Sequence, residues 1–219
     1  MGNRRLGAQR LQAMMARGAT GLDTSYQAGA GIKNAIVSHR MIKSGGIIET
    51  HILVDLQGNG KGAIWNGDSD RDVIGEATAN DGTGAVADAS LLTWEVDVHG
   101  LFRSVTVQCL EVPTGGADDI GLAASSSTLA SSGASSVADD HANDLFNPDA
   151  ALTVGTIGGI GGETTAAVNP DGDLDVDASV DDGDKIYLVN GESGTSAAYT
   201  AGKLLIIFRG GLATAKWGF

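Results

Sequence analysis

Short runs in which apolar and polar side chains alternate are the feature that most constrains the fold of this chain. In residues 48–56, apolar or β-branched residues fall on every even position, and Glu49, His51 and Asp55 fall between them. Successive side chains of a β-strand point to opposite faces, so this pattern predicts a strand with one buried face. The chain is therefore expected to be mainly β.

Further segments predict more strands of the same kind. Gly100 is expected to bend the chain between two of them, and residues 203–208 are apolar on both faces, which indicates a central or interface strand. Short strands joined by glycine-rich turns are typical of a β-sandwich or jelly-roll-like body, which we favour, or of a barrel. The expected strands span residues 94–99, with Glu95, Asp97 and His99 on the polar face, 105–109, 185–189 and 203–208, with a weaker one through Leu174, Val176 and Val180.

Bulky apolar side chains are scarce in this chain. Glycine accounts for 33 of the 219 residues, and aromatic residues make up only 5%. Alanine and glycine bury little area, and apolar burial contributes only about 25 cal/mol per Å². An isolated monomer is therefore expected to be marginally stable and to gain burial against neighbouring subunits. The single cysteine, Cys109, has no partner for a disulfide and is expected to be buried on a strand.

Charge divides the chain into two unequal parts. Residues 1–43 contain seven basic residues and one acid, a net charge of 7 − 1 = +6, and the other 176 residues contain 7 basic and 26 acidic residues, a net charge of −19. We therefore predict a basic N-terminal arm, residues 1–43, and an acidic β-rich body, residues 44–219. A body of this charge repels phosphate, so nucleic acid is not expected as the main partner. An acidic protein surface is the preferred partner of the arm, with nucleic acid as the alternative.

The extended arm is expected to contain a short helix over residues 6–17, which Gly18 would end; a non-helical arm is the alternative. Its arginines would form charge-assisted hydrogen bonds, and its apolar residues would dock in grooves of the partner. The Ser/Ala/Gly-rich segment at about residues 122–138 is expected to be a surface loop of one body. The predicted partner-binding residues are Arg4, Arg5, Arg10, Leu11, Met14, Met15, Arg17, Lys33, Arg40 and Lys43.

Residues that would carry catalysis are not grouped in the sequence. The four histidines are not spaced as metal ligands, and no hydrolase or nucleotide-binding motif occurs, so no catalytic residue, no cofactor and no enzyme activity are expected. No apolar stretch approaches 18 residues, so no membrane partner is expected. Two runs of alternating aspartates are expected to be solvated faces, with a basic patch of a partner or a cation as alternatives. They are Asp68, Asp70 and Asp72, and the weak metal candidates Asp171, Asp173, Asp175 and Asp177.

Two segments carry a resemblance to a known class of proteins. Residues 37–56, VSHRMIKSGGIIETHILVDL, resemble the opening of the folded region in virion proteins of tailed phages, many of them marine. Residues 185–191, KIYLVNG, and 198–210, AYTAGKLLIIFRG, resemble the closing hairpin of the same proteins. Together they cover about a fifth of the chain, and the stretch from about residue 68 to 182 carries no resemblance.

The resemblance implies a structural protein of the virion, commonly a decoration or cement protein of the bacteriophage capsid. Its implied partner is the major capsid protein, and its implied location is the capsid surface, after assembly in the host cytoplasm. Capsid lattices offer three-fold sites, so self-association as a homotrimer is expected. The alternatives are another virion component (head-completion, connector or tail protein), a secreted carbohydrate-binding module and a hydrolase.

Overall fold

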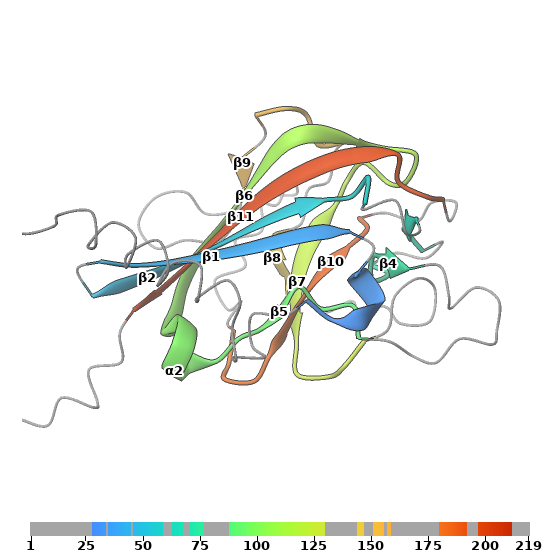
Figure 1. Ribbon diagram of the computed structural model, residues 1–219. Helices are drawn as coiled ribbons and strands as arrows, with labels where there is room; N and C mark the ends of the chain where they lie inside the picture. Colours follow the sequence, from blue (N-terminus) through green and yellow to red (C-terminus); the bar gives the residue numbers. More distant parts are fainter. Residues whose placement is uncertain are drawn as a thin grey trace, which may run out of the picture.

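Two antiparallel β-sheets pack face to face as a sandwich in the computed structural model (Figure 1). The short elements η2 (Ala30–Ile32) and α2 (Val96–His99) are the helical ones among the described residues. This architecture confirms the predicted mainly β sandwich. The structure describes residues 28–33, 35–44, 46–58, 63–67, 71–76, 88–129, 144–146, 151–155, 157–158, 180–191 and 197–211.

The first sheet contains the long strands of the molecule and the second contains shorter ones. In spatial order, the first sheet consists of β1 (Ile36–Ser44), β2 (Ile47–Asp55), β11 (Ala201–Gly211), β6 (Leu101–Thr114) and the two-residue β9 (Ile157–Gly158). The second consists of β5 (Leu92–Thr93), β10 (Lys185–Val189), β7 (Gly121–Ser125) and β8 (Asp144–Phe146). A separate two-stranded ribbon is formed by β3 (Ile64–Trp65) and β4 (Gly75–Glu76).

The strand order is that of a jelly roll. If the eight strands from β2 to β11 are numbered in chain order, leaving out the β3–β4 ribbon, the sheets read 1-8-3-6 and 2-7-4-5. Chain-adjacent strands thus cross between the sheets, except for strands 4 and 5 (β7 and β8), which pair within the second sheet, as in a double Greek key of eight strands. Strand β1 is added at the edge beside β2. The jelly-roll-like topology expected from the sequence is therefore present.

The core lies between the sheets and is lined by alternate residues of the long strands. On β2, the side chains of Ile48, Thr50, Ile52 and Val54 are buried, as the alternation predicts. The inner face of β6 buries Val105, Val107 and Cys109, and the Cys109 Sγ donates to the Glu111 carbonyl oxygen at 3.4 Å. The predicted strands over residues 105–109, 185–189 and 203–208 are all present, in β6, β10 and β11.

The predicted strand over residues 94–99 is wrong. Its last four residues form α2, a single helical turn that ends at Gly100 with a φ of 83°. His99, expected on a polar face, is fully buried, because its ring stacks on Trp94 at 4.8 Å and its Nδ1 lies 3.0 Å from Thr50 Oγ1. Packing of two large rings under the turn overrides the local alternation. Val180, expected in a weaker strand, is buried but lies outside any strand.

The sandwich extends into the segment that the charge pattern assigned to the arm. Strand β1 pairs with β2 along its whole length, from Ile36 opposite Asp55 to Ser44 opposite Ile47. Before it, Ile32 is fully buried in the core. Residues 28–33 and 35–44 therefore belong to the body, and the expected division between residues 43 and 44 falls inside β1, before its last residue. The predicted helix over residues 6–17 lies outside the described residues.

The Ser/Ala/Gly-rich segment begins as a strand and continues as a surface loop. Residues 122–125 belong to β7, and residues 126–128 are exposed, as expected of a loop. The rest of the segment, from residue 130, lies outside the described residues. Within the described residues, no helix is long and apolar enough to cross a membrane.

Candidate interaction surface

The outer face of the first sheet presents apolar side chains to solvent. Cross-strand pairing places Leu53 of β2 beside Leu205 of β11, then Gln108 of β6, then Ile157 of β9. Leu53 is 38% exposed and Ile157 is 64% exposed, and Ile207 follows one row further along β11. We name Leu53, Leu205, Ile207 and Ile157 the apolar belt. Its residues come from three strands, β2, β11 and the edge strand β9, and the polar Gln108 of β6 lies between Leu205 and Ile157.

One end of this face, next to the belt, is net acidic. Lys203 of β11 is paired across the sheet with Asp55 of β2 and Glu111 of β6. Its Nζ forms an ion pair with Glu111 and lies 3.5 Å from Asp55 Oδ2. The hydrogen bond to Glu111 and the charges of both carboxylates raise the pKa of Lys203, so the amine stays protonated. Two carboxylates and one ammonium give this acidic end a net charge of −1.

The opposite end of the face is built around Glu49 of β2. Arg209 Nε donates to Glu49 Oε1 at 2.9 Å, and His51 Nε2 donates to Glu49 Oε2 at 3.2 Å. The hydrogen bond from His51, followed by that from Arg209, lowers the pKa of Glu49. The carboxylate is therefore ionised and fixes the direction of both neighbouring side chains.

Two more arginines make this end net basic. Arg40 of β1 lies directly opposite His51 and is exposed. Arg103 of β6 lies over Gly211, since a Cβ added to that glycine would come 2.1 Å from Arg103 Nε. With Arg209 and Glu49, the charges sum to 3 − 1 = +2. The outer face thus runs from a basic end through the apolar belt to an acidic end.

The predicted partner-binding residues fall only partly in this surface. Arg40 belongs to the basic end, whereas Lys43 is exposed at the far end of β1 and Lys33 follows η2. The structure therefore does not gather these three into one cluster. Arg4, Arg5, Arg10, Leu11, Met14, Met15 and Arg17 lie outside the described residues.

Most of the charged residues of this face were not predicted from the sequence. Glu49, Arg103 and Arg209 meet only because β2, β6 and β11 are neighbours, although they are far apart in the chain. The signal that was available is the strand over residues 203–208, whose second apolar face becomes Leu205 and Ile207 of the belt. This strand was predicted to be either central in a sheet or at an interface. It is central, since β11 lies between β2 and β6.

The aspartate runs form no cation site among the described residues. Asp72, expected on a solvated face, is buried, and its backbone carbonyl accepts from the Asn190 amide at 3.0 Å. That expectation is wrong for Asp72, because the strand bridge at Val73 turns this stretch onto β10. The described residues include no group of three or more His, Cys, Asp and Glu side chains able to hold a metal ion. Asp68, Asp70, Asp171, Asp173, Asp175 and Asp177 lie outside them.

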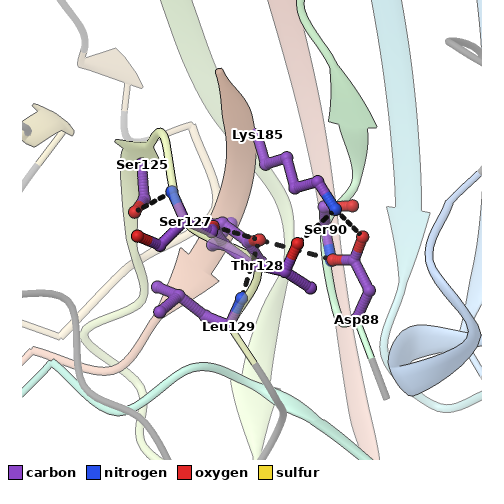
Figure 2. Close-up of polar contacts among 8 residues, drawn as sticks. Asp88, Ser90, Ser125, Ser127, Thr128, Leu129 and Lys185 are labelled. Atoms are coloured by element: carbon purple, nitrogen blue, oxygen red, sulfur yellow. Dashed lines mark hydrogen bonds and ion pairs between the residues drawn. The ribbon is translucent and has the colours of Figure 1, made fainter. Parts of the chain in front are cut away.

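A polar cluster of Asp88, Thr128, Lys185 and Tyr187 lies at one edge of the second sheet. Figure 2 shows Lys185 pointing at Asp88 and at Thr128, whose Oγ1 lies 2.8 Å from Nζ. Burial would raise the pKa of Asp88, but hydrogen bonds from Lys185 and Ser90 and the charge of Lys185 outweigh it and lower that pKa. The Asp88 carboxylate is therefore ionised, and Lys185 joins it to the Thr128 hydroxyl.

Tyr187 completes this cluster and ties the loop after β7 to the sheet. Its hydroxyl accepts from the Leu129 amide at 3.0 Å and lies 3.0 Å from the Ser127 carbonyl oxygen and 3.3 Å from Asp88 Oδ1. Burial, and then the Asp88 charge, raise the pKa of Tyr187, so the phenol remains protonated. The cluster therefore anchors the start of the Ser/Ala/Gly-rich loop to the second sheet.

Aromatic side chains are almost absent from the described surface. Trp94, Phe146, Tyr187, Tyr199 and Phe208 are buried. Phe102, half-buried, packs edge-on against Trp94 at 5.8 Å. Among the described aromatics, this leaves Trp65, half-buried in β3, as the candidate for stacking on a sugar. The outer face of the first sheet therefore has the side chains of a protein contact, aliphatic in the centre and charged at its ends.

Comparison of the chain with protein-family models, with curated proteins and with solved structures finds no match.

Proposed function

We propose that this chain is a non-enzymatic structural protein of a phage virion, which decorates the capsid by binding the outer surface of the major capsid protein lattice. The observation that carries the proposal is the joining of a net basic N-terminal segment to a strongly acidic chain. The jelly-roll body supports it, because this topology recurs in viral capsid domains, although lectins and cupins share it. The acidic body would face outward and keep particles apart in solution.

In this proposal, the segment that binds the capsid is shorter than the arm expected from charge alone. Since residues 28–33 and 35–44 are part of the sandwich, Lys33, Arg40 and Lys43 are presented by the body. Residues 1–27 then carry four arginines and one acid, a net charge of 4 − 1 = +3, and the remaining chain carries 10 − 26 = −16. In this proposal, residues 1–27 form the capsid contact, and repetition of weak contacts over the lattice supplies avidity.

The first prediction tests this contact by charge reversal. Replacing Arg4, Arg5, Arg10 and Arg17 by glutamate changes the segment from +3 to −5 and is expected to abolish cosedimentation with capsids, because like charges then face each other. The matched control replaces the same four arginines by lysine, which keeps the charge, and should retain binding at reduced strength. Unchanged decoration by the glutamate variant would refute the proposed contact.

Copy number separates decoration from other roles in the virion. A decoration protein is present in hundreds of copies per particle, whereas a connector or tail component forms a ring of about a dozen or fewer subunits. Quantitative mass spectrometry of purified particles, calibrated against the major capsid protein, gives this number. A low copy number would overturn the decoration role and leave a connector or tail role.

A further inference from the structure

We propose that His99 makes the α2 turn an acid-responsive switch, which is closed while the imidazole ring is neutral and opens when the ring binds a proton. The switch occupies one corner of the sandwich, where α2 leads into β6 and lies against β2, β6 and β11 (Figure 1). It does not involve the N-terminal capsid contact, so it stands or falls separately from the proposed function.

The closed state holds the ring of His99 among uncharged groups. The side chain is fully buried, its ring stacks on the Trp94 ring at a centroid distance of 4.8 Å, and its Nδ1 lies 3.0 Å from Thr50 Oγ1. Trp94 packs in turn against Phe102 and Phe208, at centroid distances of 5.8 and 5.5 Å. A proton on the ring would therefore place a charge among apolar side chains, which costs free energy unless an opposite charge is close.

The ionisable side chains of the packed strands lie on the opposite face of the first sheet. Those at this level are Glu49 and His51 of β2, Arg103 of β6 and Arg209 of β11. On α2, its N-cap and the turn at residues 181–184, the charged residues are all acidic and half-buried or exposed: Glu95, Asp97, Asp181, Asp182 and Asp184. Within the described part of the chain, the carboxylates thus lie at the surface of this corner, and the strands add no charge from within.

Opening of α2 requires few hydrogen bonds to break. The element is a single turn of four residues, in which the His99 and Gly100 amides donate to carbonyl oxygens of the turn at 2.7 and 2.9 Å. One side-chain bond also ends there, from Trp94 Nε1 to the Gly100 carbonyl oxygen at 3.1 Å. Short elements at the surface open locally at a lower free energy than the whole fold.

Trp94 is anchored independently of the turn. Its amide donates to the Asp184 carbonyl oxygen at 2.6 Å, and its own carbonyl oxygen accepts from the Gly183 amide at 2.7 Å. The ring of His99 can therefore leave the stack while Trp94 stays in the core. In the open state the protonated ring lies on the same short segment as the Glu95 and Asp97 carboxylates, which favour its charged form.

The second prediction tests the switch in the full-length protein. The open state binds a proton that the closed state does not, so the open fraction should rise about tenfold between pH 7.5 and pH 5.5, given the ordinary histidine pKa of about 6.5. NMR-detected hydrogen exchange, corrected for the intrinsic rate at each pH, should show this loss of protection at the His99 and Gly100 amides. Both amides should stay less protected than those of β11, because α2 opens without the rest of the sandwich.

His99→Phe keeps a ring to stack on Trp94 but cannot bind a proton, so its α2 protection should be constant over this pH range. Thermal melting checks that the variant is folded, and His39→Gln is the matched control, which should retain the tenfold change. In the wild type, the ring nitrogen chemical shifts of His99 should be those of a neutral imidazole at pH 5.5 in molecules with the closed turn, a measurement that needs no variant.

Four results overturn the proposal. They are α2 protection that does not change with pH in the wild type, a folded His99→Phe that keeps the change, a ring that is protonated while the turn stays closed, and α2 amides as strongly protected as those of β11. A tenfold loss that His99→Phe removes and His39→Gln retains supports it.

Discussion

Single half-buried polar residues join parts of the chain that are distant in sequence. The Lys185 ammonium links Asp88 to Thr128, and His39 Nε2 of β1 donates to the Leu91 carbonyl oxygen at 3.0 Å. The second contact spans the two sheets at one side of the sandwich, since β1 is the edge of the first sheet and Leu91 directly precedes β5. Such a bond compensates a buried donor and acceptor rather than adding much net stability.

The third prediction follows from the burial of His39. Burial lowers the pKa of His39, and its bond to Leu91 only partly opposes that shift. Between the ordinary histidine pKa of about 6.5 and the lower folded value, the unfolded chain binds a proton that the folded chain does not. The free energy of unfolding is therefore expected to decrease as the pH falls through this window, and to be constant above it.

Urea unfolding at a series of pH values measures this dependence. His39→Gln, whose amide can still donate to Leu91, is expected to flatten the decrease between about pH 7 and pH 5. His51→Gln serves as the matched control and should retain it. Glu49 titrates below this range, because its pKa is lowered as well. If the wild type and His39→Gln lose stability equally, the burial of His39 does not control it.

At the scale of elements, β11 contributes side chains both to the core and to the outer face of the first sheet. Its even-numbered residues Leu204, Ile206 and Phe208 are fully buried, and its odd-numbered residues form the charged ends and half of the belt. One strand can serve both purposes because its successive side chains point to opposite faces.

The fourth prediction uses two adjacent isoleucines of β11 as a matched pair. Ile206→Ala should lower the free energy of unfolding by about 2–5 kcal/mol, because it removes a fully buried side chain and leaves a cavity. Ile207→Ala, on the outer face, should cost about 1 kcal/mol or less. Urea denaturation at low protein concentration, where association is minimal, compares the two. Equal losses would contradict the assigned faces.

The elements found from the sequence are those whose own pattern is long enough to show a period. β2, β6, β10 and β11 have alternating or continuous apolar runs, and each was located within a few residues. β3, β5 and β9 have two residues each and exist only because a neighbouring strand or segment supplies their hydrogen bonds, so no local pattern marks them. The charged ends of the outer face could not be predicted for the same reason, because their residues come together only through the pairing register of strands that are distant in sequence.

At the scale of the whole molecule, the body begins earlier than its acidic composition does. The amides of Gly29 and Gly31 donate at 2.7 Å to the carbonyl oxygens of Ser90 and Asp88, and Ile32 fills the core behind them. Net charge depends on the residues at the surface, whereas the start of the folded body depends on which residues are buried. The two boundaries need not coincide.

The fifth prediction compares two truncated chains. A chain that begins at residue 36 is expected to be less stable than one that begins at residue 28, by about 2–5 kcal/mol, because it loses the buried Ile32 side chain and two backbone hydrogen bonds. Thermal melting of both proteins gives the difference. Equal melting temperatures would show that residues 28–35 are not an integral part of the sandwich.

The position of β11 has a consequence for how the protein is made. It lies between β2 and β6, and it brings together Ile52 and Ile206, which are 154 positions apart in the chain. Until the ribosome has released this last strand, β2 and β6 each lack a neighbour and offer an open edge to other nascent chains. Folding should therefore be late and slow, and the yield of native protein should depend on temperature and expression rate more than its final stability suggests.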